Sequence, residues 1–162
     1  MNISKPTALS SSPVLPSILR FPLRLFPARL QSELFVRALN RLFAQQLGDE
    51  ELDFLDNKVL SLQVKDAGIC VNVSHSNQKL IVMPNSSADL VIAGNLYDFL
   101  LLASRREDAD TLFFNRRLRL GGSTELGLFM KNFLDAFELE GRWASKLTKL
   151  LDGATSAIGR FS

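Results

Sequence analysis

The chain has 162 residues, of which 46% are hydrophobic and 22% are charged, and its formal net charge is +2. This length and composition predict one globular domain whose core needs neither disulfide bonds nor a structural metal. The single cysteine, Cys70, excludes an intramolecular disulfide and favours a reducing compartment such as the bacterial cytoplasm. No apolar run approaches the roughly 18–20 residues of a membrane span, so we expect a protein that is soluble or attached to a membrane surface.

The positive charge is concentrated at the N-terminus. Residues 1–48 hold six basic residues and one acidic residue, a net +5, which leaves −3 for the remainder of the chain. Five of the six prolines lie in the same stretch. Arginines and prolines interrupt every apolar run there, which excludes the unbroken core of a secretory signal. We therefore interpret residues 1–28 as a separate basic segment, residues 29–152 as the folded domain and residues 153–162 as a tail.

Three roles are open for the basic segment: it packs on the domain, pairs with a second copy of the chain, or contacts a bilayer. In the third, arginines meet anionic headgroups while apolar side chains insert among the acyl chains. At about 1 kcal/mol for each basic contact, such attachment would be weak and reversible. The membrane-contacting residues would be Arg20, Phe21, Arg24, Leu25, Phe26 and Arg29.

The first predicted element of the domain is an amphipathic helix over residues 30–47. Its apolar residues recur at helical spacing and Gly48 follows as a natural C-cap. A short acidic helix is expected over residues 49–55. The period then changes to two, which predicts strands at 60–64, 69–73, 79–83 and 89–93. With a hairpin turn at residues 66–68, these strands would form an antiparallel meander.

Helices return after the fourth predicted strand. Asn95 is expected to cap a helix over residues 96–103, and a charged break at 105–108 precedes a helical turn at 110–114. A fifth strand is expected at 117–120. Ser123 would then cap a helix over residues 124–140, and a last amphipathic helix would include Trp143 and Leu151.

Residues capable of catalysis are scarce. His75 is the single histidine, and its five-residue separation from Cys70 on a predicted strand places the two on opposite faces, which disfavours a Cys–His pair. We interpret His75 as a surface residue. The sequence has no HExxH, paired CxxC or phosphate-binding glycine loop, so we expect no catalytic residue, no metal and no cofactor.

The remaining charged groups have ordinary explanations. The carboxylates at 49–56 and 107–110 are typical of solvated helix faces and helix caps. Gly121, Gly122 and Ser123 could bind an anion at a helix N-terminus, but a tight turn with an N-cap is favoured. Nucleic-acid binding is disfavoured, because acidic residues separate the arginines and no aromatic–basic strand pattern occurs.

The chain contains twelve phenylalanines, and six of them follow the predicted meander, on or beside helices. Composition alone leaves two interpretations open. These rings either fill an ordinary core or line an apolar ligand cavity.

The order of elements resembles the sterol-carrier-protein type of lipid-binding domain over roughly Leu30 to Leu139. The resemblance is strongest in DLVI (89–92), NLYDFL (95–100), DADTLFF (108–114) and RLRLGG (117–122). It implies an α/β (α+β) fold in which helices cover a five-stranded, mostly antiparallel sheet, with a lipid cavity between sheet and helices. Together with helical periodicity, it predicts that the cavity wall includes Leu112, Phe113, Phe114, Leu126, Phe129, Met130, Phe133 and Phe137.

Further strings resemble the accessory factors of bacterial ubiquinone biosynthesis within that family. They are LDFL (52–55), DTLFFNRRL (110–118), GSTELGL (122–128) and KN (131–132). The resemblance implies a non-enzymatic role in oxygen-independent ubiquinone synthesis. Such a protein binds polyprenylated quinone intermediates or membrane phospholipid and presents them to pathway enzymes, including a peptidase-like hydroxylation pair. It would be cytoplasmic and peripheral at the inner membrane. The alternative is a ligand-free scaffold whose apolar faces mediate dimerisation or assembly of an enzyme complex.

Overall fold

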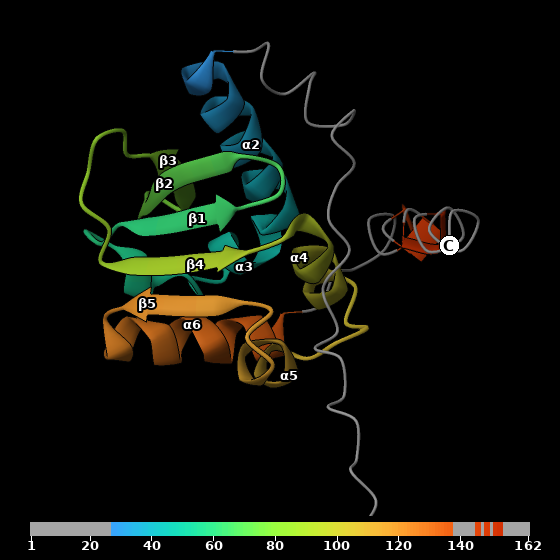
Figure 1. The fold of residues 1–162 in the computed structure, drawn as a ribbon. Coiled ribbons are helices and arrows are strands. Elements are labelled where there is room, and N and C mark those ends of the chain that lie inside the picture. Colours follow the sequence, from blue (N-terminus) through green and yellow to red (C-terminus); the bar gives the residue numbers. More distant parts are fainter. Residues whose placement is uncertain (1–26, 138–144, 147, 150, 154–162) are drawn as a thin grey trace, which may run out of the picture.

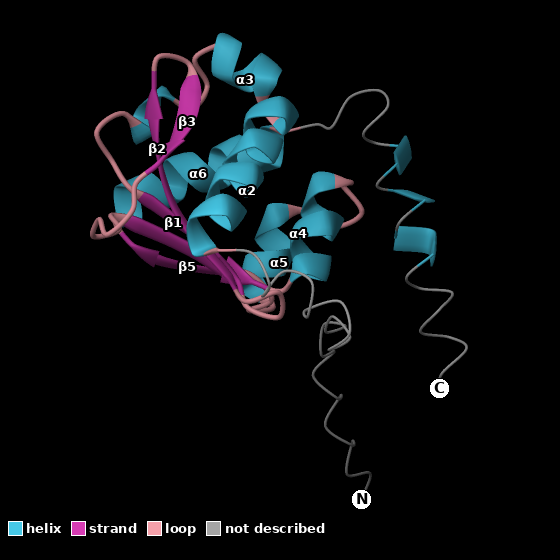
Figure 2. Cartoon of the chain, turned by 90° about the horizontal axis from the view of Figure 1, so that it is seen from above, coloured by secondary structure: helices cyan, strands magenta, loops and turns pink. Residues whose placement is uncertain are grey.

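The computed structural model describes residues 27–137, 145, 146, 148, 149 and 151–153. In this part of the chain a five-stranded sheet forms one layer and helices gather on one side of it (Figures 1 and 2). The α+β architecture with a mostly antiparallel sheet is therefore as the sequence predicts. No helix in the described ranges is both long and apolar enough to cross a membrane.

The elements fall in the order helix, sheet, helix, strand, helix. They are α2 (Ala28–Leu42), α3 (Ala44–Gly48), the 3-10 turn η1 (Asp53–Leu55), β1 (Leu60–Val64), β2 (Ile69–Ser76), β3 (Lys79–Val82), β4 (Leu90–Gly94), α4 (Leu96–Ala103), α5 (Ala109–Phe114), β5 (Arg119–Gly122) and α6 (Thr124–Ala136). The acidic helix expected at 49–55 is thus reduced to η1. The helix expected to reach residue 140 ends at Ala136, because Phe137 has an extended backbone.

The sheet order is β3-β2-β1-β4-β5, which corrects the predicted four-strand meander. The first three strands do form a meander, but β4 pairs in parallel with β1 instead of following β3. The chain therefore returns across the sheet between β3 and β4, and β5 then adds antiparallel to β4. Alternation of apolar residues identifies a strand but not its neighbour, which is why the sequence could not reveal this crossover.

The two faces of the sheet differ in polarity, as the period of two requires. Leu60, Val73 and Ile92 are buried in the core on the helix side. On the opposite side, Gln63 donates to Ser61, whose hydroxyl lies 3.8 Å from the Cys70 thiol. Cys70 is exposed. The helices therefore cover the apolar face and leave the polar face to loops and solvent.

The predicted helix 30–47 is divided at Phe43, which separates α2 from α3. The Phe43 ring lies edge-to-face on Phe133 and Phe137, at centroid distances of 5.5 and 4.9 Å. The side chain of Asn40 holds α2 against the edge strand β3. It donates to the Leu80 carbonyl at 2.9 Å and accepts from the Leu80 amide at 2.7 Å, much as a neighbouring strand would.

Apolar side chains pack in two clusters. The main core lies between the sheet and helices α2, α3 and α6. A smaller cluster, here called the satellite cluster, joins α4 and α5 through Leu102, Ala109, Leu112 and Leu118. The buried carboxylate of Asp98 on α4 lies 2.5 Å from the Arg117 guanidinium just before β5. The α4–α5 region is therefore attached to the sheet by both packing and an ion pair.

Three helices of the described region end in the same unusual way. Glu50, Arg105 and Arg116 have φ angles of 62°, 55° and 56°, a left-handed backbone usually given to glycine. After each helix the same pair of backbone bonds forms; for α5, the Arg116 amide donates to Phe113 and the Arg117 amide to Leu112. The predicted C-cap role of Gly48 is thus wrong, because Glu50 takes the left-handed position.

The helix N-termini are capped partly as expected. Asp108 accepts from the Thr111 amide at 2.6 Å and Ser123 accepts from the Leu126 amide at 3.3 Å, which confirms the capping interpretation of both. Asn95 precedes α4 but makes no side-chain cap bond. The carboxylate of Asp66, in the β1–β2 turn, instead accepts from the Leu96 amide at 2.9 Å.

Candidate functional site

An open pocket with a volume of about 650 Å³ lies between α5, β5 and α6. This volume is within the usual range for small-molecule sites, roughly 300–1,000 Å³. Its lining combines four apolar and four charged side chains: Phe113, Phe114, Leu118, Leu120, Asp110, Arg116, Arg119 and Lys131. We call this the basic pocket. Such a lining suits an amphiphile with an apolar body and an anionic end.

Three cations and one carboxylate line the basic pocket, so its net charge is positive. Lys131 on α6 forms an ion pair with Asp110 on α5. The hydrogen bond to Asp110, reinforced by the charge of the same carboxylate, raises the pKa of Lys131. Arg116 and Arg119 are exposed, and Phe114 beside them is 87% exposed. An aromatic ring this exposed among cations is typical of a contact with an amphiphilic, anionic surface.

The basic pocket lies where the two apolar clusters meet. Leu120 packs against the main core, whereas Leu118 belongs to the satellite cluster and Phe113 packs on it. The ion pair between Asp98 and Arg117 holds the chain immediately before β5, so the pocket floor is fixed from the α4 side. An apolar ligand entering between Leu118 and Leu120 would therefore approach both clusters.

The eight predicted wall residues lie in three environments. Leu126, Met130, Phe133 and Phe137 are buried in the main core, where the last two rings stack at 6.0 Å. Leu112 and Phe113 belong to or pack on the satellite cluster, and Phe113 also lines the basic pocket. Phe114 and Phe129 are exposed.

Sequence reasoning missed the polar half of the basic pocket, Asp110, Arg116, Arg119 and Lys131. It also missed Leu118 and Leu120, although a signal for them was present. These leucines alternate with Arg117 and Arg119 in the predicted fifth strand, so they share one face.

A smaller pocket of about 200 Å³ lies between the end of α4 and the end of α6. Most of its lining is polar, and Arg105 donates from one side to the carbonyls of Asp135 and Phe137. Burial, followed by the charge of Asp110, raises the pKa of Asp135. The size and polarity of this pocket suit a role in joining the two helices better than a lipid site.

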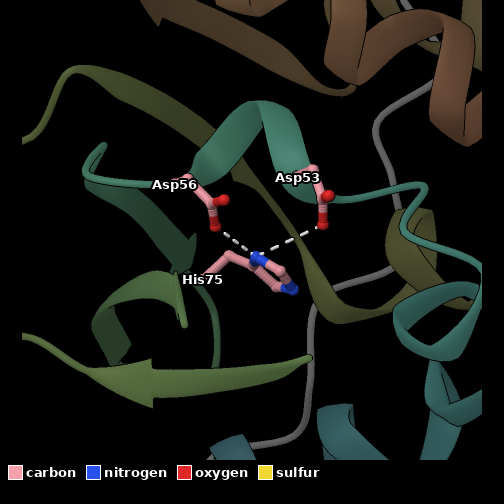
Figure 3. A group of neighbouring side chains, drawn as sticks. All are labelled: Asp53, Asp56 and His75. Carbon is pink, nitrogen blue, oxygen red and sulfur yellow. Dashed lines mark hydrogen bonds and ion pairs between the residues drawn. The ribbon is translucent and has the colours of Figure 1, made fainter. Parts of the chain in front are cut away.

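His75 is not the surface residue that we expected from the sequence. Only 5% of it is exposed, and its Nδ1 contacts the carboxylate of Asp56 and lies 3.7 Å from that of Asp53 (Figure 3). Asp56 also forms an isolated β-bridge with His75. The imidazole therefore joins η1 to β2, and it lines neither pocket.

Asp53, Asp56 and His75 are the one group in the described ranges whose ligand atoms lie close enough to share a metal ion. A metal on Nδ1 would require the proton on Nε2, and Nε2 is buried without a hydrogen-bond partner. Histidines that bind metals almost always donate their other N–H to an acceptor. The neutral tautomer with its proton on Nδ1, donating to Asp56, leaves only a lone pair buried and fits the geometry better. We interpret the group as a structural contact.

Of the six predicted membrane-contacting residues, Arg20, Phe21, Arg24, Leu25 and Phe26 lie outside the described residues. Arg29 is in the first turn of α2 and is exposed. Leu30 and Leu34, one helical turn apart on the same helix, are also exposed. The start of α2 therefore presents both charge and apolar surface.

Comparison with known proteins agrees with this architecture. The model of the SCP-2 sterol transfer family matches residues 37–135. The ubiquinone biosynthesis accessory factor UbiT of Escherichia coli K12 is 43% identical over 125 residues, which are 77% of this chain and 72% of UbiT; the O157:H7 protein matches equally well. A solved UbiJ-SCP2 ubiquinone synthesis protein has the same fold, with a TM-score of 0.52 at 18% identity over 66% of this chain and 95% of that one. The chain belongs to the SCP-2 sterol transfer family.

Proposed function

We propose that this chain is a non-catalytic, lipid-binding accessory factor of ubiquinone biosynthesis. The observation that carries the proposal is the 43% identity to UbiT, which extends over most of both chains. The basic pocket adds physical support, because it offers apolar and cationic groups to one ligand. His75, the chain's single histidine, is engaged with Asp56 and does not reach the pocket, so no acid–base residue of that type serves a ligand there.

The ligand we propose is a polyprenylated quinone intermediate or a membrane phospholipid. Its polar end would meet Arg116, Arg119 and Lys131, and its chain would pass between Leu118 and Leu120. The eight predicted wall residues would then form successive parts of the path rather than one wall. Phe113 and Phe114 would lie at its entrance and Leu112 beside that entrance. The buried residues of α6 and Phe137, which follows it, would lie at the inner end. Phe129 would lie beside that end.

The inner end of the path is filled by packed side chains, so lipid entry requires α6 to move relative to the sheet. Met130 has an unbranched side chain that adapts to irregular shapes, and it lies in the α6 face that would have to repack. Such a cavity exists mainly in the ligand-bound population, since a ligand stabilises the conformation that it fits.

The pathway step we propose is the oxygen-independent one, with the peptidase-like hydroxylation pair as the enzymes that receive the ligand. The protein would act in the cytoplasm and contact the inner membrane peripherally. Arg29 and the basic segment of residues 1–28 would meet anionic headgroups there, and the exposed Leu30 beside them would insert among acyl chains.

A ligand-free scaffold is the second candidate, favoured by the exposed Leu128 and Phe129 on α6. The two candidates differ in the lipid, since a ligand-free scaffold would bind an enzyme or a second copy through this surface and hold no lipid.

Genetic complementation tests the pathway assignment. The chain is expressed in an E. coli strain lacking UbiT, and ubiquinone is measured by chromatography after growth with and without oxygen. We expect restored ubiquinone in anaerobic cells and no change in aerobic cells. A chain that is expressed and folded but restores none would contradict the proposal.

A further inference from the structure

The described region exposes apolar side chains in two very different electrostatic settings. Phe114 lines the basic pocket together with three cationic side chains. Phe129, which is 45% exposed, instead lies against Phe54 of η1, with ring centroids 5.8 Å apart. Several acidic residues around η1 are exposed, and Glu125 lies one helical turn before Phe129. We call this second area the acidic aromatic surface: Asp49, Glu50, Glu51, Asp53, Phe54, Glu125, Leu128 and Phe129.

This surface is held in place by contacts beneath it. The buried imidazole of His75 contacts the carboxylate of Asp56 and lies near that of Asp53, on either side of Phe54 (Figure 3). Leu52, just before η1, and Leu55, its last residue, are buried in the main core. The carboxylates at positions 49–51 are left facing solvent. A fixed aromatic pair beside outward carboxylates loses little conformational entropy when a partner binds.

The negative charge of the acidic aromatic surface indicates which kind of partner could bind there. An anionic leaflet repels carboxylates, so a membrane is disfavoured. In a symmetric dimer the same patch faces itself, and like charges would meet. Nucleic acid is disfavoured as well, because its phosphates and these carboxylates are both negative. A protein with basic side chains at the rim of its docking site is complementary in both charge and apolar character.

We propose that the acidic aromatic surface docks a basic surface of a partner protein, which in the proposed function is an enzyme that receives the lipid. This inference rests on the proposed function for the identity of that enzyme. The two ring faces and their acidic rim form a small area, so the complex is transient and its association rate depends on salt.

Glu50 permits a test that does not depend on a destabilised variant. Its φ of 62° is one that glycine adopts without strain. Glu50→Gly therefore removes a charge from the surface while relieving the backbone. Phe129→Ala removes the exposed ring, and Glu33→Lys, an exposed change on α2, serves as the control for net charge.

The experiment measures binding of the full chain to the purified hydroxylation pair by biolayer interferometry. We expect about a tenfold weaker Kd for Glu50→Gly and for Phe129→Ala, no loss for Glu33→Lys, and weaker wild-type binding as salt rises from about 0.05 to 0.5 M. Thermal melting should show that Glu50→Gly is at least as stable as the wild type.

Several outcomes would overturn the inference. They are no binding of the wild-type chain to the pair, equal binding of all variants, a wild-type dimer that Glu50→Gly dissociates in sedimentation, or recruitment of this surface to anionic vesicles. Anaerobic complementation without binding to the pair would overturn the inference and leave the proposed function standing. Failure of complementation would overturn the proposed function itself.

Discussion

Three charged residues of the described region, Glu50, Arg105 and Arg116, have a left-handed backbone at the end of a helix. Arg105 has a structural reason for its conformation, because its side chain donates to the carbonyls at the end of α6. Arg116 lines the basic pocket, and Glu50 lies on the acidic aromatic surface. Glycine would be less strained at both of these positions, so their side chains are expected to serve binding rather than stability.

Arg116→Gly tests this trade-off. Relief of the left-handed strain, less the extra flexibility of glycine in the unfolded chain, should raise the free energy of unfolding by up to about 1 kcal/mol. Loss of the guanidinium should weaken binding of an anionic lipid. Denaturant unfolding and a liposome-flotation assay measure the two effects. A variant that is less stable, or that binds lipid as well as the wild type, would disagree with this account of Arg116.

Asp135 provides a prediction about pH. Its pKa in the folded state is raised, mainly by burial, so the charged carboxylate lowers stability above that pKa. As pH falls through the folded pKa, the carboxylate takes up a proton in the native state before it does so in the unfolded state. The loss of stability caused by the buried charge is therefore gone once pH is below the ordinary aspartate pKa of about 4. Asp135→Asn should therefore melt at a higher temperature than the wild type at pH 7. The difference in melting temperature should shrink as pH falls below the ordinary aspartate pKa of about 4.

Asp108 supplies the matched control, because its shift has the opposite sign. The amide of Thr111 donates to this carboxylate and lowers its pKa, so the charged form adds stability above the ordinary pKa and loses it as pH falls. Asp108→Asn should lower the melting temperature at pH 7, with a difference that also shrinks in acid. Shifts of the same sign for the two variants would refute the assignment.

The burial of His75 could have been predicted from the sequence, whereas its partner could not. Val71, Val73 and His75 continue one alternation, so extending β2 by a single step would have predicted an inward-facing imidazole. What the sequence could not supply is its partner, since Asp56 is nineteen positions away and reaches His75 only after the chain folds.

Among the elements, the contact between α2 and the edge strand β3 makes a testable contribution to stability. Asn40 satisfies both backbone groups of Leu80 that face away from β2. Asn40→Ala leaves them unpaired in a partly buried site and should cost about 1–3 kcal/mol. Arg37→Ala, an exposed change on the same helix, should alter stability by less than about 0.5 kcal/mol. Urea unfolding compares the two, and equal losses would argue against the role of Asn40.

The strands themselves were readable from the period of two, and β1 to β3 form the meander that pattern predicts. The position of β4 in the sheet could not be predicted. A strand that pairs with a neighbour on both sides has the same alternation of apolar residues as a strand at the edge of the sheet. Likewise, the break at Phe43 interrupts a helical pattern without any proline or glycine. Its cause is the packing of that ring on Phe133 and Phe137, a contact between distant segments.

At the scale of the whole molecule, two exposed apolar areas of the described residues have opposite charge. The basic pocket lies between α5, β5 and α6, and the acidic aromatic surface lies around η1 and the outer side of α6. Helix α6 contributes to both. A carrier that takes an anionic amphiphile on one side and meets a basic protein on the other needs this division.

The candidate site was predictable in its apolar half and not in its polar half. Of the wall residues that periodicity and the resemblance predicted, Phe113 and Phe114 line the basic pocket. Periodicity identifies apolar residues on one face of a helix. It cannot distinguish the buried ring of Phe133 from a ligand-contacting one, since both satisfy the same spacing. The cations of the basic pocket come from the α5–β5 turn, β5 and α6, and their convergence depends on where α5 and α6 meet β5.

Native mass spectrometry of the full chain tests lipid binding most directly. The protein is purified without detergent and also incubated with a polyprenylated quinone precursor or an anionic phospholipid. We predict a retained lipid mass on the wild type, reduced in Arg116→Gly and in Phe114→Ser, an exposed change that leaves the core intact. A folded wild-type chain that shows only its bare mass, both as purified and after incubation, would contradict the account.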